Sequence, residues 1–171
     1  MDAPLYNAEI LRLAASIPLV ERLAAPQATV YGLSPQATVR RVSPICGSRV
    51  TVDVILAADG RIEAFGQEVR ACALGQASAS ILGRHVLGGT AEQLRLAHDL
   101  LKAWLKGAEP FPALLAEYFP ELALLAPARA HPARHPSILL AFDTTAAAAE
   151  QAAEQTTAQT AGQALAPARG G

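Results

Sequence analysis

Cysteine is the residue type of this sequence best suited to metal or sulfur chemistry, and it occurs twice. Cys46 lies in the segment Ser-Pro-Ile-Cys-Gly-Ser, whose composition predicts a tight turn before a strand. Cys72 directly precedes a helical pattern, where the positive end of the helix dipole favours the thiolate that binds metals. The long gap between them matches no metal-binding spacing, so two small buried thiols are the alternative interpretation.

Histidine supplies the other candidate ligands. His131 and His135 flank Arg134 in a stretch bounded by prolines, which would form a ligand loop before the last helix. The alternative is a solvated basic loop, and we favour it for His131. His85 falls on the apolar face of a helical pattern and is interpreted as a core histidine, whereas His98 is expected at the surface.

Other common functional motifs are missing from the sequence. It contains no Gly-x-Gly-x-x-Gly, no Walker A pattern, no Gly-x-Ser-x-Gly elbow and no pair of carboxylates at catalytic spacing. The chemistries that depend on these motifs are therefore poorly supported.

Charge and composition exclude several classes of partner. The 171 residues carry 14 Lys and Arg against 15 Asp and Glu, so the chain has no overall field that would attract nucleic acid or an anionic membrane. No apolar run is long enough to span a bilayer, and the segment MDAPLYNAEI lacks the basic start of a secretory signal. Two cysteines are too few for a disulfide framework. We expect a cytoplasmic protein.

The elements that would position these residues follow the order helix, sheet, helices. Strand patterns cover residues 37–42, 49–57 and 61–69, with an Asp-Gly turn between the last two. Helical patterns cover residues 5–16, 74–85, 94–105, 113–119 and 136–152. Thr90 and Gln93 form a capping box before the third of these helices. We expect one α+β domain over residues 1–152 and a low-complexity, disordered tail over residues 153–171.

Three stretches of the chain resemble NifU/IscU-type iron–sulfur cluster assembly scaffolds. Residues 43–50 are similar to the family's Asn-Pro-x-Cys-Gly-Asp-x-Val, and residues 71–80 to its Gly-Cys-Ala-x-x-x-Ala-Ser-Ala-Ser. Residues 134–142 resemble the family's stretch around its third cysteine, and the turn at residues 59–62 also fits. The resemblance covers residues 5–150, and the stretch around Cys72 is its most specific part.

The resemblance implies a fold, a function and partners. The fold would be IscU/NifU-like α+β, a three-stranded antiparallel sheet covered by helices. Such scaffolds are not enzymes: they hold a nascent [2Fe–2S] cluster, or a zinc ion, on three cysteines and an aspartate or histidine. They receive sulfur from a cysteine desulfurase and pass the cluster to recipient apo-proteins.

The sequence departs from the family's ligand set at two positions. Ser48 stands where the family has its aspartate, and either Pro136 or Ser137 stands in place of the third cysteine. We favour Ser137, because Leu139 and Leu140 then fall where the family is apolar. Serine is a poor metal ligand at neutral pH, because its hydroxyl resists deprotonation.

The resemblance leaves Cys46, Cys72 and His135 as the implied ligands of iron, a [2Fe–2S] cluster or zinc. We expect the two thiols to meet at one end of the sheet, with His135 nearer to them than His131. Two chains in a homodimer would supply four thiolates, the usual number for such a cluster. Two alternatives remain open: an interaction module of the sulfur-transfer machinery that binds no metal, and a relay in which Cys72 accepts a persulfide.

Overall fold

The structure is a computed structural model that describes residues 4–23 and 36–165. Residues 26–36 hold two prolines and a glycine, a composition that predicts a loop, and most of this stretch lies outside the described residues. The elements are, in chain order, α1 (Ala8–Ala15), β1 (Gln36–Val42), β2 (Arg49–Leu56), β3 (Ile62–Arg70), α2 (Ala73–His85), α3 (Ala91–Leu105), α4 (Ala113–Tyr118), the 3-10 segments Pro120–Ala130 and Pro132–Arg134, and α5 (His135–Ala164).

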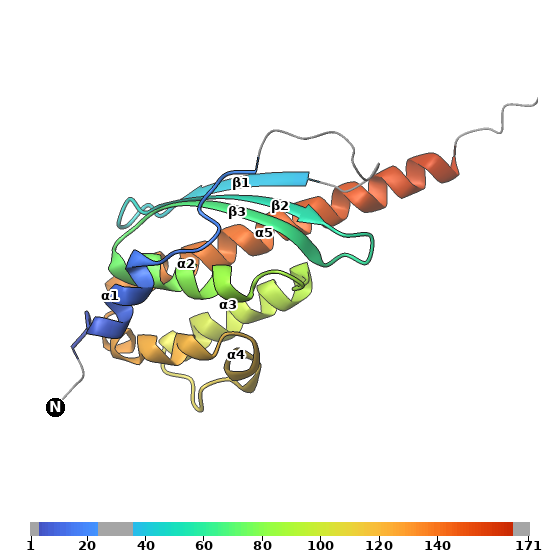
Figure 1. The fold of residues 1–171 in the computed structure, drawn as a ribbon. Helices are drawn as coiled ribbons and strands as arrows, with labels where there is room; N and C mark the ends of the chain where they lie inside the picture. The colour runs from blue at the N-terminus through green and yellow to red at the C-terminus, as the bar shows by residue number, and fades with distance from the viewer. Residues whose placement is uncertain (1–3, 24–35, 166–171) are drawn as a thin grey trace, which may run out of the picture.

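The three strands form one antiparallel sheet in the order β1-β2-β3, which confirms the predicted fold class. Asp59 and Gly60 make the turn between β2 and β3, with Gly60 in the left-handed region at φ +84°. Helices gather on one side of the sheet, and α5 runs along it (Figure 1). Val52 and Val54 of β2 are fully buried in the resulting core.

Residues 19–23, which follow α1, run over the face of the sheet turned away from the helices (Figure 1). Arg22 binds both carboxylate oxygens of Asp53 at 2.6 and 2.9 Å, and the Leu23 amide and the Thr38 hydroxyl donate to the same carboxylate. Burial opposes ionisation of Asp53, but these hydrogen bonds outweigh it, so the pKa of Asp53 is lowered. Both faces of β2 are therefore buried, although the alternating pattern alone assigns Asp53 to a polar face.

Helices α3 and α5 pack side by side in opposite directions. Near the start of α3, Arg95 binds Glu150 at 2.8 and 2.9 Å and Asp143 at 2.9 Å. Near its end, Leu105 lines the same surface hollow as His135, the first residue of α5. The N-terminus of α5 is thus held beside the C-terminus of α3.

Helix α5 is longer than the sequence pattern predicted. It continues to Ala164 instead of ending at Ala152, so residues 153–164 are helical rather than disordered in the structure. Ala152 is the last buried residue, and the residues beyond Ala153 are almost all exposed. Alanine and glutamine favour helix even without tertiary contacts, which explains why the helix outlasts its packing.

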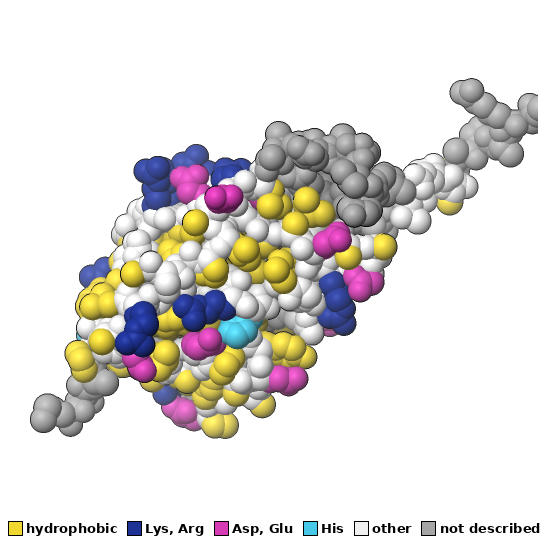
Figure 2. All heavy atoms as spheres, in the orientation of Figure 1, with side chains coloured by type: hydrophobic (Ala, Val, Ile, Leu, Met, Phe, Trp, Pro, Cys, Tyr) yellow, Lys and Arg dark blue, Asp and Glu magenta, His cyan; other side chains and the backbone are white. Residues whose placement is uncertain are grey.

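Surface charge is mixed in sign. On the face shown in Figure 2, Lys and Arg side chains lie next to Asp and Glu side chains. None of the helices within residues 4–23 and 36–165 has the length and apolarity needed to cross a membrane.

Candidate functional site

The register of the sheet brings the two cysteines to the same end of the molecule. Arg49, the first residue of β2, pairs with Arg70, the last residue of β3. Cys46 lies in the loop just before Arg49, and Cys72 lies just after Arg70 as the N-cap of α2. Two residues far apart in the sequence therefore meet because antiparallel pairing places a strand start opposite a strand end.

The loop that carries Cys46 is closed by its own backbone. The Ser43 amide donates to the Ser48 carbonyl at 2.8 Å, and the Gly47 amide donates to the Ser43 carbonyl at 3.0 Å. Gly47 has φ +69°, a conformation that a side chain at this position would disfavour. This turn leaves the Cys46 side chain exposed and turns the Ser48 side chain inward.

A chain of hydroxyl contacts links the two thiols. The Cys46 thiol donates to Ser48 Oγ at 3.1 Å, Ser48 Oγ lies 3.2 Å from Ser137 Oγ, and Ser137 Oγ lies 3.2 Å from Cys72 Sγ. The two sulfur atoms are consequently less than about 10 Å apart, so they lie on the same side of the molecule and do not point into separate cores. Both hydroxyls are buried, whereas Cys46 is exposed and Cys72 is half-buried.

Of the two candidates for the position of the third cysteine, the geometry favours Ser137. Its hydroxyl touches both Cys72 and Ser48, while the Pro136 ring lines two hollows on the surface. Gly75 makes this arrangement possible: a Cβ at Gly75 would collide with the Ser137 hydroxyl and lie 3.0 Å from the Ser137 carbonyl oxygen. The absence of a side chain at Gly75 lets α2 approach the start of α5.

The hydroxyls also shape the acidity of Cys46. Burial opposes the thiolate, but the hydrogen-bonded hydroxyl and the backbone of Ser48, with the nearby hydroxyls of Ser43 and Ser137, outweigh it, so the pKa of Cys46 is lowered. A thiolate is both the better nucleophile and the form that ligates metals. The structure therefore favours the reactive form of the more exposed of the two thiols.

His135 does not join this group in the structure. Its Nε2 lies 2.9 Å from the Ala128 carbonyl oxygen, and its ring is buried against the 3-10 segment. Side chains two residues apart on a helix are rotated by about 200° around its axis, so they project from nearly opposite sides. Because the Ser137 hydroxyl contacts Cys72, the His135 side chain projects away from the thiols. Within residues 4–23 and 36–165 no three His, Cys, Asp or Glu side chains are grouped as a metal site.

The other histidines lie apart from the thiols. His131 is exposed, as favoured from the sequence. The interpretation of His85 as a core histidine is wrong, because the residue is exposed, with Nε2 2.8 Å from Glu121. His98 is more buried than expected, its side chain 13% exposed and Nδ1 2.9 Å from Asp99.

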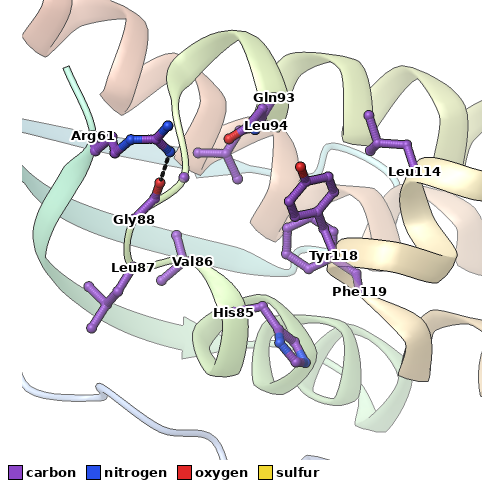
Figure 3. A pocket seen from close by; sticks show the side chains of 11 residues that line it. Arg61, His85, Val86, Leu87, Gly88, Gln93, Leu94, Leu114, Tyr118 and Phe119 are labelled. Carbon is purple, nitrogen blue, oxygen red and sulfur yellow. Dashed lines mark hydrogen bonds between the residues drawn. The ribbon is translucent and has the colours of Figure 1, made fainter. Parts of the chain in front are cut away.

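A separate cavity of about 220 Å³ lies at the opposite end of the sheet (Figure 3). Arg61 stands at its rim and donates to the Gly88 carbonyl at 2.8 Å, while Tyr118 and Phe119 come from the end of α4. The cavity lies beside the turn between β2 and β3, and the length of these strands separates it from the loop that carries Cys46, so it forms no part of the thiol site.

The sheet, the covering helices and the thiol pair define an α+β scaffold of the NifU/IscU type. The structure of a nitrogen-fixing NifU-like protein (N-terminal) from Brucella abortus is 38% identical to this chain, with a TM-score of 0.75, and the match covers 88% of this chain and 95% of that one. The chain belongs to the NifU/IscU-type family of iron–sulfur cluster assembly scaffolds.

A more distant structure shares the fold alone. It is described as an iron–sulfur cluster assembly scaffold for the SUF system of Fervidobacterium islandicum AW-1, with 16% identity, a TM-score of 0.70 and a match over 85% of this chain and 96% of that one. Neither a protein-family model nor a curated protein sequence matches the chain.

The hydroxyl chain that joins the thiols is not apparent in the sequence. Ser48 stands out there only because it replaces the family's aspartate, and Ser43 does not stand out at all. The one available signal was the alignment that placed Ser137 at the third cysteine position. Contact between Ser48 and Ser137 depends on how β2 and α5 pack, which no local pattern encodes.

Proposed function

We propose that this scaffold holds iron, a nascent [2Fe–2S] cluster or a zinc ion as its cargo through Cys46 and Cys72. The observation that supports the proposal is the meeting of both thiols at one end of the sheet, joined by two buried hydroxyls at positions where the family carries ligands. Thiolates are the ligands of choice for iron–sulfur clusters and for zinc.

The cargo would be held weakly. Two thiolates offset less of the charge of an iron pair than three do, and the hydroxyls of Ser48 and Ser137 remain protonated at neutral pH. The expected complex is therefore sensitive to oxygen and to chelators.

A second copy of the chain would complete the ligand set. Cys46 is exposed, and its neighbours Val42 and Ile45 are 52% and 69% exposed, so a partner can approach the thiol. Two chains meeting there would surround one cluster with four thiolates. We infer further that a cysteine desulfurase supplies the sulfur and that apo-proteins receive the cluster, with the chain acting as a carrier rather than an enzyme.

Anaerobic reconstitution with ferrous iron and sulfide tests the proposal. Iron, zinc and sulfide per chain are measured together with the visible absorption spectrum and the mass of the complex in solution. Cys72→Ser and Cys46→Ser should each abolish uptake, while Ser137→Cys should slow loss of iron to a chelator. Circular dichroism controls for folding. Full retention of iron and sulfide in a folded Cys72→Ser variant would leave a metal-free interaction module as the better hypothesis.

A persulfide relay is the second candidate, and the lowered pKa of Cys46 supports it. The Cys46 thiolate would attack the outer sulfur of a persulfide on the desulfurase, forming a new S–S bond and releasing the desulfurase cysteine as a thiolate. The sequence suggests Cys72 for this role, but the exposure of Cys46 makes Cys46 the better acceptor. Alkylation after incubation with a loaded desulfurase, followed by mass spectrometry, shows which cysteine carries the added sulfur.

A further inference from the structure

A second hollow, of about 510 Å³, lies between the end of α3 and the start of α5. Lys102 and Lys106 stand at one side of it, Arg129 at another, and His135 and Leu139 belong to the α5 side. We refer to it as the basic hollow. It is open to solvent and is distinct from the thiol site, because His135 and Ser137 project from nearly opposite sides of α5.

Its charge comes from the two lysines, which are the only lysines of the chain. They are four residues apart, so they project from the same side of α3, and both are exposed. Neither makes an ion pair within the described part of the chain. Arg129 adds little net charge, because its guanidinium pairs with Glu109 and lies 5.1 Å from the Trp104 ring centroid.

The remaining walls are apolar. Leu105 is buried, Leu139 is half-buried, and Pro132 and Pro136 complete the lining. An inorganic anion would use the lysines but leave these walls unused. A nucleotide base would find no aromatic side chain to stack on except the His135 ring, whose Nε2 is already bonded to the backbone.

We propose that the basic hollow docks an acidic peptide segment of a partner protein, with carboxylates on Lys102 and Lys106 and an apolar side chain against Pro136 and Leu139. The charge of the lysines and the apolar walls are complementary to such a segment. Pro136 lines the hollow and directly precedes Ser137, so the docked partner contacts the first turn of the helix that also carries Ser137. The proposal does not depend on metal binding by the thiols.

The test is selection from a displayed library of random short peptides on the full-length, metal-free protein. Enriched peptides should combine Asp or Glu with Leu, Ile or Phe, and their binding should weaken as salt is raised. In Lys102→Glu/Lys106→Glu their affinity should fall about tenfold or more, the size expected for two exposed charge contacts. Lys102→Gln/Lys106→Gln should give a smaller loss in the same direction.

Arg12→Glu/Arg40→Glu is the matched control, since it changes the net charge equally at two exposed arginines on α1 and β1. It should leave peptide affinity unchanged. The proposal is overturned if no acidic peptides are enriched, if both charge reversals weaken binding equally, or if the lysine variants bind the peptides as tightly as the native chain. It is equally overturned if ATP or a short RNA competes for the lysines and acidic peptides do not.

Discussion

Gly75 lies in the first turn of α2, where this helix meets the start of α5. A Cβ at this position would lie 2.8 Å from the Ala71 Cβ and 3.0 Å from the Ser137 carbonyl oxygen, and it would overlap the Ser137 hydroxyl. Two of these three contacts involve backbone or a short side chain, which cannot swing away. Gly75→Ala must therefore move α2 and α5 apart or displace Ser137.

The cost follows from two opposing effects. Adding a methyl group to a packed interior costs about 1–3 kcal/mol. The better helix propensity of alanine offsets up to about 1 kcal/mol of this destabilisation, and less in the first turn of a helix. We expect a net loss of about 1–2 kcal/mol in the free energy of unfolding, which corresponds to a fall in melting temperature of about 2–8 °C for a domain of this size.

The site should respond as well as the fold. Displacing Ser137 removes a hydroxyl that favours the Cys46 thiolate, so the pKa of Cys46 should rise toward its usual value. Thermal unfolding measures the first effect. The second is measured by the pH dependence of iodoacetamide alkylation, resolved for each cysteine by mass spectrometry.

Gly162→Ala is the matched control, because a Cβ at Gly162 has no atom within 4 Å. It should leave the Cys46 titration unchanged and leave stability equal or slightly higher. The reasoning fails if Gly75→Ala behaves like Gly162→Ala in both measurements, since α2 and α5 would then have room that the structure does not contain.

Three further outcomes are expected. Asp53→Asn should lower the free energy of unfolding at pH 7 by about 1–3 kcal/mol. Because the folded pKa of Asp53 is lowered, the advantage of the carboxylate is fully present above the unfolded pKa of about 3.9 and is lost as pH falls through the folded pKa. The gap should therefore narrow in urea titrations as pH is lowered below the unfolded pKa, and a constant gap would contradict this. Truncation before Thr156 should leave the melting temperature unchanged, and a drop of several degrees would show that the end of α5 packs. His135→Ala should retain iron and sulfide uptake while costing about 1–3 kcal/mol for the unpaired Ala128 carbonyl; loss of uptake in a folded variant would return His135 to the ligand set.

Features encoded by neighbouring residues were predictable from the sequence. The capping box is present as expected, with the Thr90 hydroxyl accepting from the Gln93 amide at 3.2 Å and the Gln93 side chain accepting from the Thr90 amide at 3.1 Å. The strands match their predicted bounds to within a residue, since alternation and an Asp-Gly turn are local signals.

Features that depend on packing were not predictable. Arg22 and Asp53 are far apart in the sequence, and nothing in either neighbourhood indicates that one neutralises the other. His135 is a case in which sequence proximity misleads. It lies two residues from Ser137, which suggests that its side chain lies near the thiols. The helical rotation between the two residues separates them, and this depends on α5 beginning at His135 rather than after it.

The hydroxyls at the lost ligand positions explain how the site keeps its shape without a metal. Ser48 and Ser137 contact each other, and each contacts one of the two thiols, so these two buried hydroxyls are paired in the metal-free state. A metal bound by Cys46 and Cys72 would have to remove the thiols from these contacts and leave the two hydroxyls with fewer partners. In a site with three cysteine thiolates and an aspartate, a bound metal relieves the repulsion between these negative charges. In this site a bound metal would instead displace favourable hydrogen bonds. The same two substitutions therefore remove ligands and stabilise the empty state, and both effects lower the affinity for the cargo.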